Sequence, residues 1–466
     1  MPEAPGSGRN AVRSVARPRP GHSLPGRRRG IAASAGTRSG SGPRVLPGNG
    51  CATINRERLQ PQARMALRIP LLNIKAQHHS IKPDIDAAVA EVSESEKHIL
   101  GPHVKACEEA VASYCGAAYG VGVSSGCEAL RVSLRTAGLG PEDEVITPAF
   151  SFFATAGCIA QLGITPAFVD IDPITYNIHP AKVEARLTSR TKAILVVHLF
   201  GQMADMKPIM TFAKRHGLVV IEDVAQAIGA EYRGRRAGSI GHYGCLSFGD
   251  FGEGGMVVIN DREQAARLQV FSIYRPDSTC RNTNAGGNSR LDSPQAAAML
   301  ARLEHFDNWT DRRQANARRY DGLFEARGLV ALDLVRLPKV ASGTAVPAGG
   351  QQEQSFPGGP GTGDAAFVRH AFTQYVIRVQ RRYELQTFLK AKGIDTEVLY
   401  PMHLQECFAH LKCSPGDFPE SEKAANEALA LPIYPELSDE QATYVVDCVA
   451  DFLGKRVSRP ASRRRI

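Results

Sequence analysis

The sequence predicts an α/β protein whose large domain holds a mostly parallel sheet between helices, joined to a smaller C-terminal α/β domain. Three observations support this fold class. Short apolar segments typical of buried strands alternate with segments whose apolar residues recur at helical spacing. Several strands end in turns of small residues that lead directly into a helix, as in βαβ units. The chain has 466 residues with 43% hydrophobic content, enough for a large core and a second, smaller one.

The elements follow in order along the chain. Strands of the large domain are expected at residues 119–123, 145–148, 166–171, 193–197, 219–223 and 256–259. Helices of this domain are expected at residues 81–116, 155–162 and 206–216, from 262 onward, and as one long helix at about 294–324. The smaller domain is expected to hold strands at 372–378 and 396–399 and helices at 381–392, 419–430 and 438–453.

Changes in composition set the expected domain boundaries. Residues 1–64 form a basic leader whose Arg-, Gly-, Pro- and Ser-rich composition predicts disorder, because it can bury little apolar surface. We interpret it as a disordered leader or as upstream sequence included through a wrong start codon. The alternative is an organelle transit peptide. The large domain is placed at 65–308 and the small domain at 309–454, with a flexible Gly- and Pro-rich insertion at 340–365. Residues 455–466 form a basic tail.

The positive charge of the chain resides in its two ends. The leader carries +10 and the tail +6, so the net charge of +9 leaves −7 for residues 65–454. A mildly acidic body gives no reason to expect nucleic-acid binding. The sequence has no run of about 18 apolar residues, so no membrane span is predicted. The ten cysteines show no metal-binding spacing and fit a reducing compartment, so we expect a cytoplasmic protein or, if the leader is a transit peptide, an organellar one.

Three segments of the large domain could bind a phosphate-bearing heteroaromatic ligand. Gly126 and Cys127 open a helix after a strand, where backbone N–H groups and the helix dipole favour an anion. Phe152 follows the next strand and could stack on a ring, although a core phenylalanine is the more ordinary explanation. Asp223 ends a strand and could pair with a protonated ring nitrogen, whereas helix N-capping is its ordinary role. Gln226 could reach a phenolic oxygen of the same ring.

Two more segments complete the candidate site. Ser247 offers a hydroxyl near the phosphate, although a small residue at a strand end is equally common. The segment at 287–292 contains Asn288 and precedes the long helix, where Asp292 could be an N-cap. Four further side chains could line a pocket or belong to the core: Tyr176, His198, His370 and Tyr400.

The order and spacing of these pieces resemble one protein family. The resemblance covers residues 68–454 and is carried by seven segments, at 69–78, 124–130, 143–150, 197–202, 221–226, 287–292 and 431–437. Among them are Ser-Ser-Gly-x-x-Ala-Leu, Asp-Glu-Val-Ile-Thr-Pro-Ala-Phe, Ile-Glu-Asp-x-Ala-Gln and Gly-Asn-Ser-Arg-Leu-Asp. They are similar to the DegT/StrS-type sugar aminotransferases, which depend on pyridoxal 5′-phosphate (PLP). The resemblance implies the fold-type I architecture.

The resemblance also implies roles for individual residues. Gly126 and Cys127 would hold the PLP phosphate with help from Ser247, although a threonine is usual at position 127. Phe152 would stack on the ring, Asp223 would pair with the pyridine nitrogen, and Gln226 would contact the phenolic oxygen.

Partners and substrates are implied in the same way. Asn288 would reach the phosphate in a neighbouring subunit, so the resemblance implies a homodimer with shared active sites. The amino donor would be glutamate, and the acceptor a keto sugar on a nucleotide.

One element of the family pattern is absent. The lysine that forms a Schiff base with PLP is expected just after Phe248, but Ser247-Phe248 runs directly into a Gly-rich turn, about five or six residues short. No lysine occurs between Lys214 and Lys339, so the sequence offers no catalytic residue of this kind and predicts non-covalent PLP binding. Three interpretations follow: an error in the sequence of an ordinary sugar aminotransferase, an inactive paralogue acting as partner subunit or ligand-binding regulator, or an enzyme with slow or altered chemistry.

Overall fold

The computed structural model describes residues 68–95, 97, 99–249, 252–273, 286–341 and 368–454. The predicted leader at 1–64, the tail at 455–466 and nearly all of the insertion at 340–365 lie outside the described residues. The domain boundary expected near residue 308 stays a prediction.

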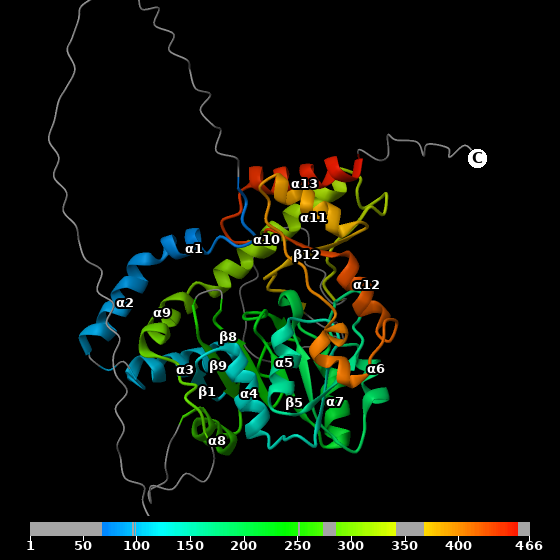
Figure 1. Ribbon diagram of the computed structural model, residues 1–466. Helices are drawn as coiled ribbons and strands as arrows, with labels where there is room; N and C mark the ends of the chain where they lie inside the picture. The colour runs from blue at the N-terminus through cyan, green and yellow to red at the C-terminus, as the bar shows by residue number, and fades with distance from the viewer. Residues whose placement is uncertain are drawn as a thin grey trace, which may run out of the picture. The chain divides into compact units, whose positions relative to one another are not determined.

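A seven-stranded sheet forms the centre of the large α/β part (Figure 1). Its strand order is β1-β9-β8-β5-β4-β2-β3. The strands are β1 (Tyr119–Val123), β2 (Glu144–Pro148), β3 (Thr165–Val169), β4 (Thr191–Val197), β5 (Val219–Asp223), β8 (Tyr243–Ser247) and β9 (Gly255–Ile259). β9 pairs antiparallel with both β8 and β1, and the other pairings in the sheet are parallel. The predicted α/β class and the six predicted strands are therefore confirmed.

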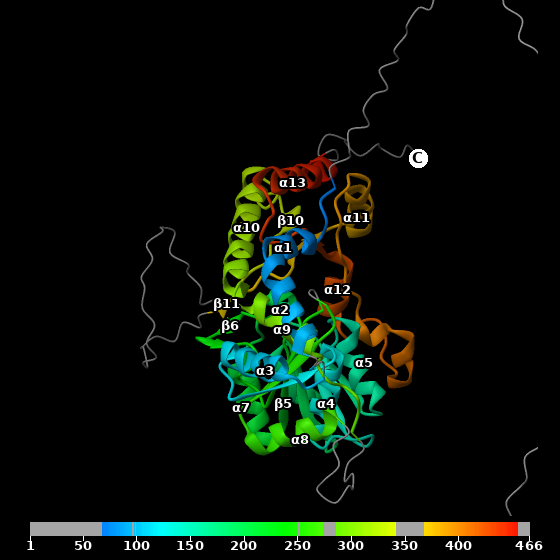
Figure 2. The ribbon, with the colours of Figure 1, turned by 90° about the vertical axis from the view of Figure 1, so that its left-hand side faces the viewer.

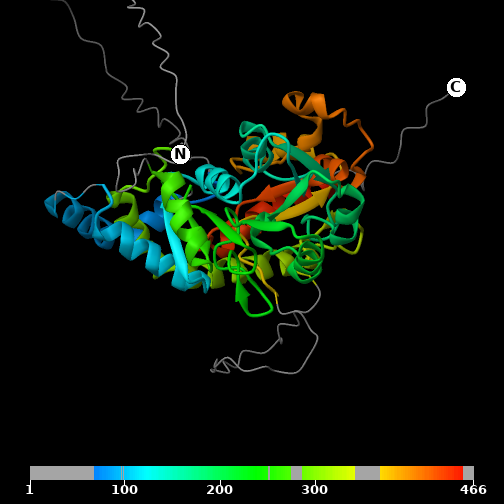
Figure 3. The same cartoon turned by 90° about the horizontal axis from the view of Figure 1, so that it is seen from below.

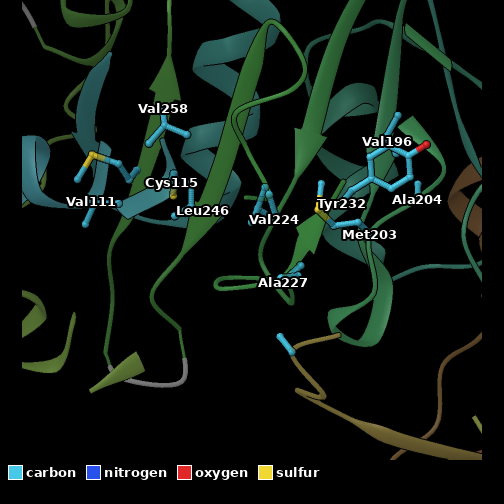
Figure 4. Close-up of a cluster of buried hydrophobic side chains, with 14 of the residues drawn as sticks. Val111, Cys115, Val196, Met203, Ala204, Val224, Ala227, Tyr232, Leu246 and Val258 are labelled. Atoms are coloured by element: carbon cyan, nitrogen blue, oxygen red, sulfur yellow. The ribbon is translucent and has the colours of Figure 1, made fainter. Parts of the chain in front are cut away.

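Helices cover both faces of this sheet, as Figure 3 shows. One core contains apolar side chains from α3 (Pro102–Cys115), α7 (Met206–His216) and α9 (Ser293–Leu303). The opposite core contains those of α4 (Gly126–Thr136) and α5 (Phe153–Gln161), together with α8 (Arg262–Ser272). Successive residues of β4 alternate between the two cores, as the two-residue period of a strand requires. Figure 4 shows part of the first core, where Leu246 of β8 and Val258 of β9 lie near Cys115 of α3.

A second, smaller sheet lies in the C-terminal part of the chain. β12 (Tyr375–Val379) pairs antiparallel with β10 (Val335–Arg336) on one side and β13 (Ala428–Leu431) on the other. Its apolar side chains pack with those of α10 (Phe306–Ala326), α11 (Arg382–Ala391) and α13 (Asp439–Gly454), helices that Figure 2 shows close to β10. The other α-helices and β-strands of the described residues are α1 (Ile74–Ser80), α2 (Lys82–Ser95), α6 (Pro180–Val183), α12 (Pro419–Glu427), β6 (Glu231–Tyr232), β7 (Arg235–Arg236) and β11 (Val368–Arg369).

Several predicted helices were wrong in extent. The helix expected at 81–116 is two helices, because the left-handed backbone at Leu100, with φ +51°, interrupts the segment before Pro102 starts α3. The helix expected at 294–324 breaks at His305, whose N–H donates to the Arg302 carbonyl in a tight turn. The break directs the side chain of Phe306, which is 6% exposed, into the core. Residues at the end of the helix expected at 419–430 form β13, and the strand expected at 396–399 is a single bridge at Glu397.

The topology brings several functional segments to one edge of the sheet. β4, β5 and β8 are parallel neighbours, so their carboxyl ends lie together, and this is the edge where open α/β sheets bind ligands. The amino end of α4 reaches the same edge, because β1 leads into it through Ser124 and Ser125. Within the described ranges, every helix is too short or too polar to cross a membrane.

Candidate functional site

One pocket at this edge gathers six of the seven predicted cofactor-binding residues: Gly126, Cys127, Phe152, Asp223, Gln226 and Ser247. They come from four separate segments of the chain, namely the start of α4, the start of α5, the end of β5 with its following turn, and the end of β8. The rest of the lining is mostly small or aliphatic. The pocket therefore has polar groups converging on an apolar enclosure, which is typical of a small-molecule site.

The amino end of α4 forms the first wall of the pocket. Ser125 is the N-cap, and its hydroxyl accepts a hydrogen bond from the Glu128 N–H at 3.2 Å. The N–H groups of Gly126 and Cys127 belong to the first turn, where a helix has no internal acceptor for them. A Cβ on Gly126 would lie 2.5 Å from the Cβ of Ser247, so glycine is needed for the hydroxyl to approach the helix end. The arrangement is suited to an anion such as phosphate.

Asp223 forms another part of the pocket wall and is 7% exposed. Its carboxylate accepts a hydrogen bond from the Thr155 hydroxyl at 2.9 Å and one from the Ala225 N–H at 3.2 Å. Burial raises the pKa of this carboxyl group above its usual value, and the two hydrogen bonds oppose that shift. No helix starts after Asp223, so the N-cap reading was wrong. Among the residues described, no cation forms an ion pair with this buried carboxylate, which therefore suits a protonated ring nitrogen.

Glu222, next to Asp223 on β5, points to the other side of the strand and has a structural role. It is fully buried, and its Oε2 accepts a hydrogen bond from His198 Nε2 at 2.8 Å. The ring orientation of His198 is fixed because its Nδ1 accepts from the Ala204 N–H at 3.2 Å. Neither side chain lines the pocket. His198, a plausible pocket residue from the sequence, is thus part of the core.

Two side chains between these walls are placed for contact with a ring. Phe152 is 57% exposed and lines the pocket, so the core reading of this phenylalanine was wrong. The Gln226 side-chain oxygen accepts a hydrogen bond from the Phe200 N–H at 2.8 Å. This bond fixes the amide orientation and leaves its NH₂ group as the donor available to a ligand oxygen.

The hairpin between β8 and β9 closes despite the missing segment. Ser247 pairs with Gly255, and the Phe248 N–H donates to the Gly254 carbonyl at 3.0 Å. Gly254 has φ +153°, a conformation that favours glycine. Phe248 is 3% exposed within the core. Residues 250 and 251 lie outside the described residues, and no residue that lines the pocket is a lysine.

Asn288 is not part of the pocket in this chain. Its side chain is exposed, while the neighbouring Ser289 carbonyl accepts a hydrogen bond from the Ser124 N–H at 2.9 Å. Its predicted contact with a neighbouring subunit stays a prediction. Asp292 is the N-cap of α9, and its side chain accepts a hydrogen bond from the Gln295 N–H at 2.8 Å. The N-cap role predicted for Asp292 from the sequence is thus confirmed.

The remaining pocket candidates from the sequence are placed elsewhere. Tyr176 and His370 are buried and Tyr400 is 54% exposed, and none of the three lines the pocket. Sequence reasoning missed Thr155, which positions Asp223. The signal available was its position three residues after Phe152, in a segment that the sequence already assigns to the site.

Comparison with known proteins places this geometry in a family. The DegT/DnrJ/EryC1/StrS aminotransferase family model matches residues 79–346 and 350–450. The chain is 45% identical over 394 residues to a pleiotropic regulatory protein of Geobacillus stearothermophilus, covering 83% of this chain and 99% of that protein. It is 38% identical over 393 residues to a dTDP-3-amino-3,4,6-trideoxy-alpha-D-glucose transaminase of Streptomyces venezuelae, covering 83% of this chain and 96% of that protein.

Solved structures give the same assignment. S. venezuelae DesV superposes with a TM-score of 0.74 at 36% identity, over 84% of this chain and 99% of that chain. Bacillus subtilis NtdA with bound pyridoxamine phosphate (PMP) superposes with a TM-score of 0.70 at 28% identity, over 86% of this chain and 87% of that chain. The fold, the pocket and these matches lead to one conclusion: the chain belongs to the DegT/DnrJ/EryC1/StrS family of sugar aminotransferases.

Proposed function

We propose that this protein has the binding site of a nucleotide-sugar aminotransferase, which moves an amino group from glutamate to a keto sugar on a nucleotide. The observation that carries the proposal is the pairing of Asp223, a buried carboxylate without a cation, with the anion-binding end of α4 across one pocket. A phosphate and a protonated ring nitrogen are two of the charged groups of PLP. The nucleotide-sugar acceptor is supported by the transaminase names of relatives such as the S. venezuelae enzyme.

The residues present fit PLP or its amine form, PMP. The α4 N–H groups and Ser247 would hold the phosphate, while Asp223 would keep the ring nitrogen protonated. Phe152 would cover one face of the ring, and the Gln226 NH₂ would donate to the ring oxygen. When bound, the cofactor supplies an electron sink for reactions at the substrate amino carbon.

The missing lysine limits what this chain can do with that cofactor. A lysine amine normally anchors PLP and moves the proton during amino transfer. No pocket-lining residue carries an amine, so we propose that the cofactor is held by non-covalent contacts. As the chain stands, its proton-transfer step is slowed or lost.

This absence favours a second candidate function. An inactive paralogue that keeps the ligand site could act as a partner subunit or as a ligand-binding regulator. The 45%-identical relative is named a pleiotropic regulatory protein, and that name is consistent with this candidate. Re-reading the transcript across codons 245–255 tests the first interpretation, an error in the sequence, because a lysine codon there would restore an ordinary aminotransferase.

Borohydride reduction tests the proposed mode of cofactor binding. With saturating PLP, we expect a bound-cofactor absorbance that disappears on gel filtration after reduction, because no covalent link exists for borohydride to fix. Intact-protein mass spectrometry measures this outcome. A cofactor mass retained on a peptide of the pocket would contradict non-covalent binding, and a sugar aminotransferase with its lysine serves as the positive control.

Glutamate half-reaction kinetics separate the two candidate functions. The slow-enzyme reading predicts 2-oxoglutarate formation from glutamate and bound PLP, at a rate reduced by about 10³-fold or more relative to a lysine-containing relative, because the general acid–base group is absent. Stopped-flow absorbance and 2-oxoglutarate quantification measure it. Ligand binding with no 2-oxoglutarate above that of free PLP supports the inactive paralogue.

A homodimer with shared sites is part of the same proposal. We expect sedimentation equilibrium to give twice the chain mass. We also expect Asn288→Ala to weaken PLP binding without changing that mass. PLP affinity unchanged in Asn288→Ala would contradict the role proposed for Asn288, and a parent protein that sediments as a monomer would contradict the shared site.

A further inference from the structure

Two thiols lie together at the phosphate end of the pocket. Cys127 is the second residue of α4 and is exposed. Cys158 lies on α5 and is 2% exposed. Its Sγ donates to the Cys127 carbonyl oxygen at 3.5 Å, so the two cysteines are in direct contact. The proposed aminotransferase chemistry requires neither thiol.

The two sulfurs have opposite proton affinities. The hydrogen bond from Cys158 lowers the pKa of Cys127 to about 7, against smaller upward effects of burial and of Asp223. The same bond, together with burial, raises the pKa of Cys158 well above its ordinary value. Near neutral pH, the pair therefore consists of an accessible thiolate beside a buried, protonated thiol. A thiolate at a helix amino end is the usual setting of a reactive cysteine.

We propose that Cys127 is an oxidation site and that Cys158 is its resolving thiol, so that a hydroperoxide converts the pair into a disulfide joining α4 to α5. The Cys127 thiolate attacks one peroxide oxygen, the O–O bond breaks, and the products are a sulfenic acid and hydroxide. The Cys158 sulfur then attacks the sulfenic sulfur, the S–O bond breaks, and water leaves with the Cys158 proton. In total, two thiols lose two electrons, and hydrogen peroxide is reduced to two waters.

A phosphate-bearing ligand is expected to protect this pair, a point that rests on the proposed function. The phosphate would occupy the α4 end where the Cys127 thiolate lies, and two negative charges at one helix end repel each other. Bound phosphate therefore covers the sulfur and raises its pKa. α5 also carries Thr155, the hydrogen-bond donor to Asp223, so the disulfide would link the phosphate end of the pocket to the ring end.

Peptide mapping of the full-length protein tests the disulfide directly. After one equivalent of hydrogen peroxide at pH 7.5, we expect a linked pair of tryptic peptides, with fragment ions that join Cys127 to Cys158, and reversal by dithiothreitol. Cys158→Ala is expected to leave a sulfenic acid on Cys127 that dimedone traps, formed more slowly because the hydrogen bond that lowers the Cys127 pKa is lost. Cys407→Ser, which removes another exposed cysteine, is the matched control and should still form the link. Retention of both thiols, or pairing of Cys127 with a different cysteine, would overturn the proposal.

Alkylation kinetics test the accessible thiolate independently. With iodoacetamide at pH 7.5, Cys127 is expected to react about fivefold faster than the cysteine of a reference peptide. A thiol of ordinary pKa is about 10% ionised at this pH, whereas most of Cys127 is thiolate because its pKa is about 7. Inorganic phosphate and PLP should each slow this reaction, whereas chloride at equal ionic strength should not. Disulfide formation without phosphate protection would leave the oxidation site intact and count against the proposed phosphate position. Alkylation no faster than that of the peptide would overturn the oxidation site itself.

Discussion

Replacing Asp223 by asparagine is expected to weaken PLP binding about 100-fold, equivalent to about 2.7 kcal/mol, because a neutral amide cannot pair with a protonated ring nitrogen. The same substitution is expected to raise the stability of the ligand-free protein at pH 7. Burial raises the pKa of Asp223 in the folded state, so its ionised form opposes folding above the ordinary carboxyl pKa. Asparagine retains the size of the side chain and can still pair with Thr155 and the Ala225 N–H.

PLP titration and thermal unfolding measure the two halves of this prediction. The gain in stability should be present at pH 7 and should disappear near pH 3, where Asp223 is protonated in both the folded and the unfolded state. Unchanged PLP affinity in Asp223→Asn would show that this carboxylate does not contact the cofactor. A loss of stability at pH 7 would contradict the proposed cost of holding it buried without a cation.

Replacing the adjacent Glu222 by glutamine is expected to lower the free energy of unfolding by about 3 kcal/mol, with little direct effect on the pocket. The Glu222 Oε1 accepts from the N–H groups of Ile240, at 2.8 Å, and Gly241. Its Oε2 accepts from the Gly238 N–H at 3.0 Å and from His198. Glutamine has one oxygen, so its NH₂ group would face two of these donors in a site without water access.

The pH dependence gives a second measure of the same carboxylate. Burial alone would raise the pKa of Glu222, but the hydrogen bonds from His198 and from backbone N–H groups outweigh it and lower the pKa. The stabilisation is therefore present above the unfolded pKa of 4.5 and is lost as the pH falls through the folded value.

Urea unfolding of the parent and Glu222→Gln proteins at pH 7 and pH 3 tests this dependence. The difference in unfolding free energy should shrink at the lower pH. A difference that stays constant would contradict the role given to the charge. Asp223→Asn and Glu222→Gln are matched controls for each other, since the first should weaken PLP binding without lowering stability, whereas the second should lower stability and change binding little.

Much of the fold could be predicted because local patterns and the final structure agree. The strand predicted at 219–223 has the bounds of β5, and the helix predicted at 206–216 has the bounds of α7. Their apolar spacing is set by the same two-residue and 3.6-residue periods that decide which side chains become buried. The failures lie where distant contacts override local preference, as at His305, where burial of Phe306 favours a break in an otherwise helical segment.

The candidate site was predictable for a related reason. Family motifs mark the ends of parallel strands, and topology brings those ends to one edge, so six predicted residues meet in one pocket. Periodicity could not separate Asp223 from Glu222, since both end the same strand. Alternation along β5 sends one side chain into the pocket and the other into the core.

The sequence alone indicated the family, named six residues that meet in one pocket and shows no lysine after Phe248, because these depend on residue identity and order along the chain. Only the tertiary structure decided that the β8–β9 hairpin closes without the missing segment, that Thr155 supports Asp223, and that Cys158 lies against Cys127. Each of these depends on contacts between segments whose distance in space is set by the packing of helices on the sheet, and no local pattern encodes that distance.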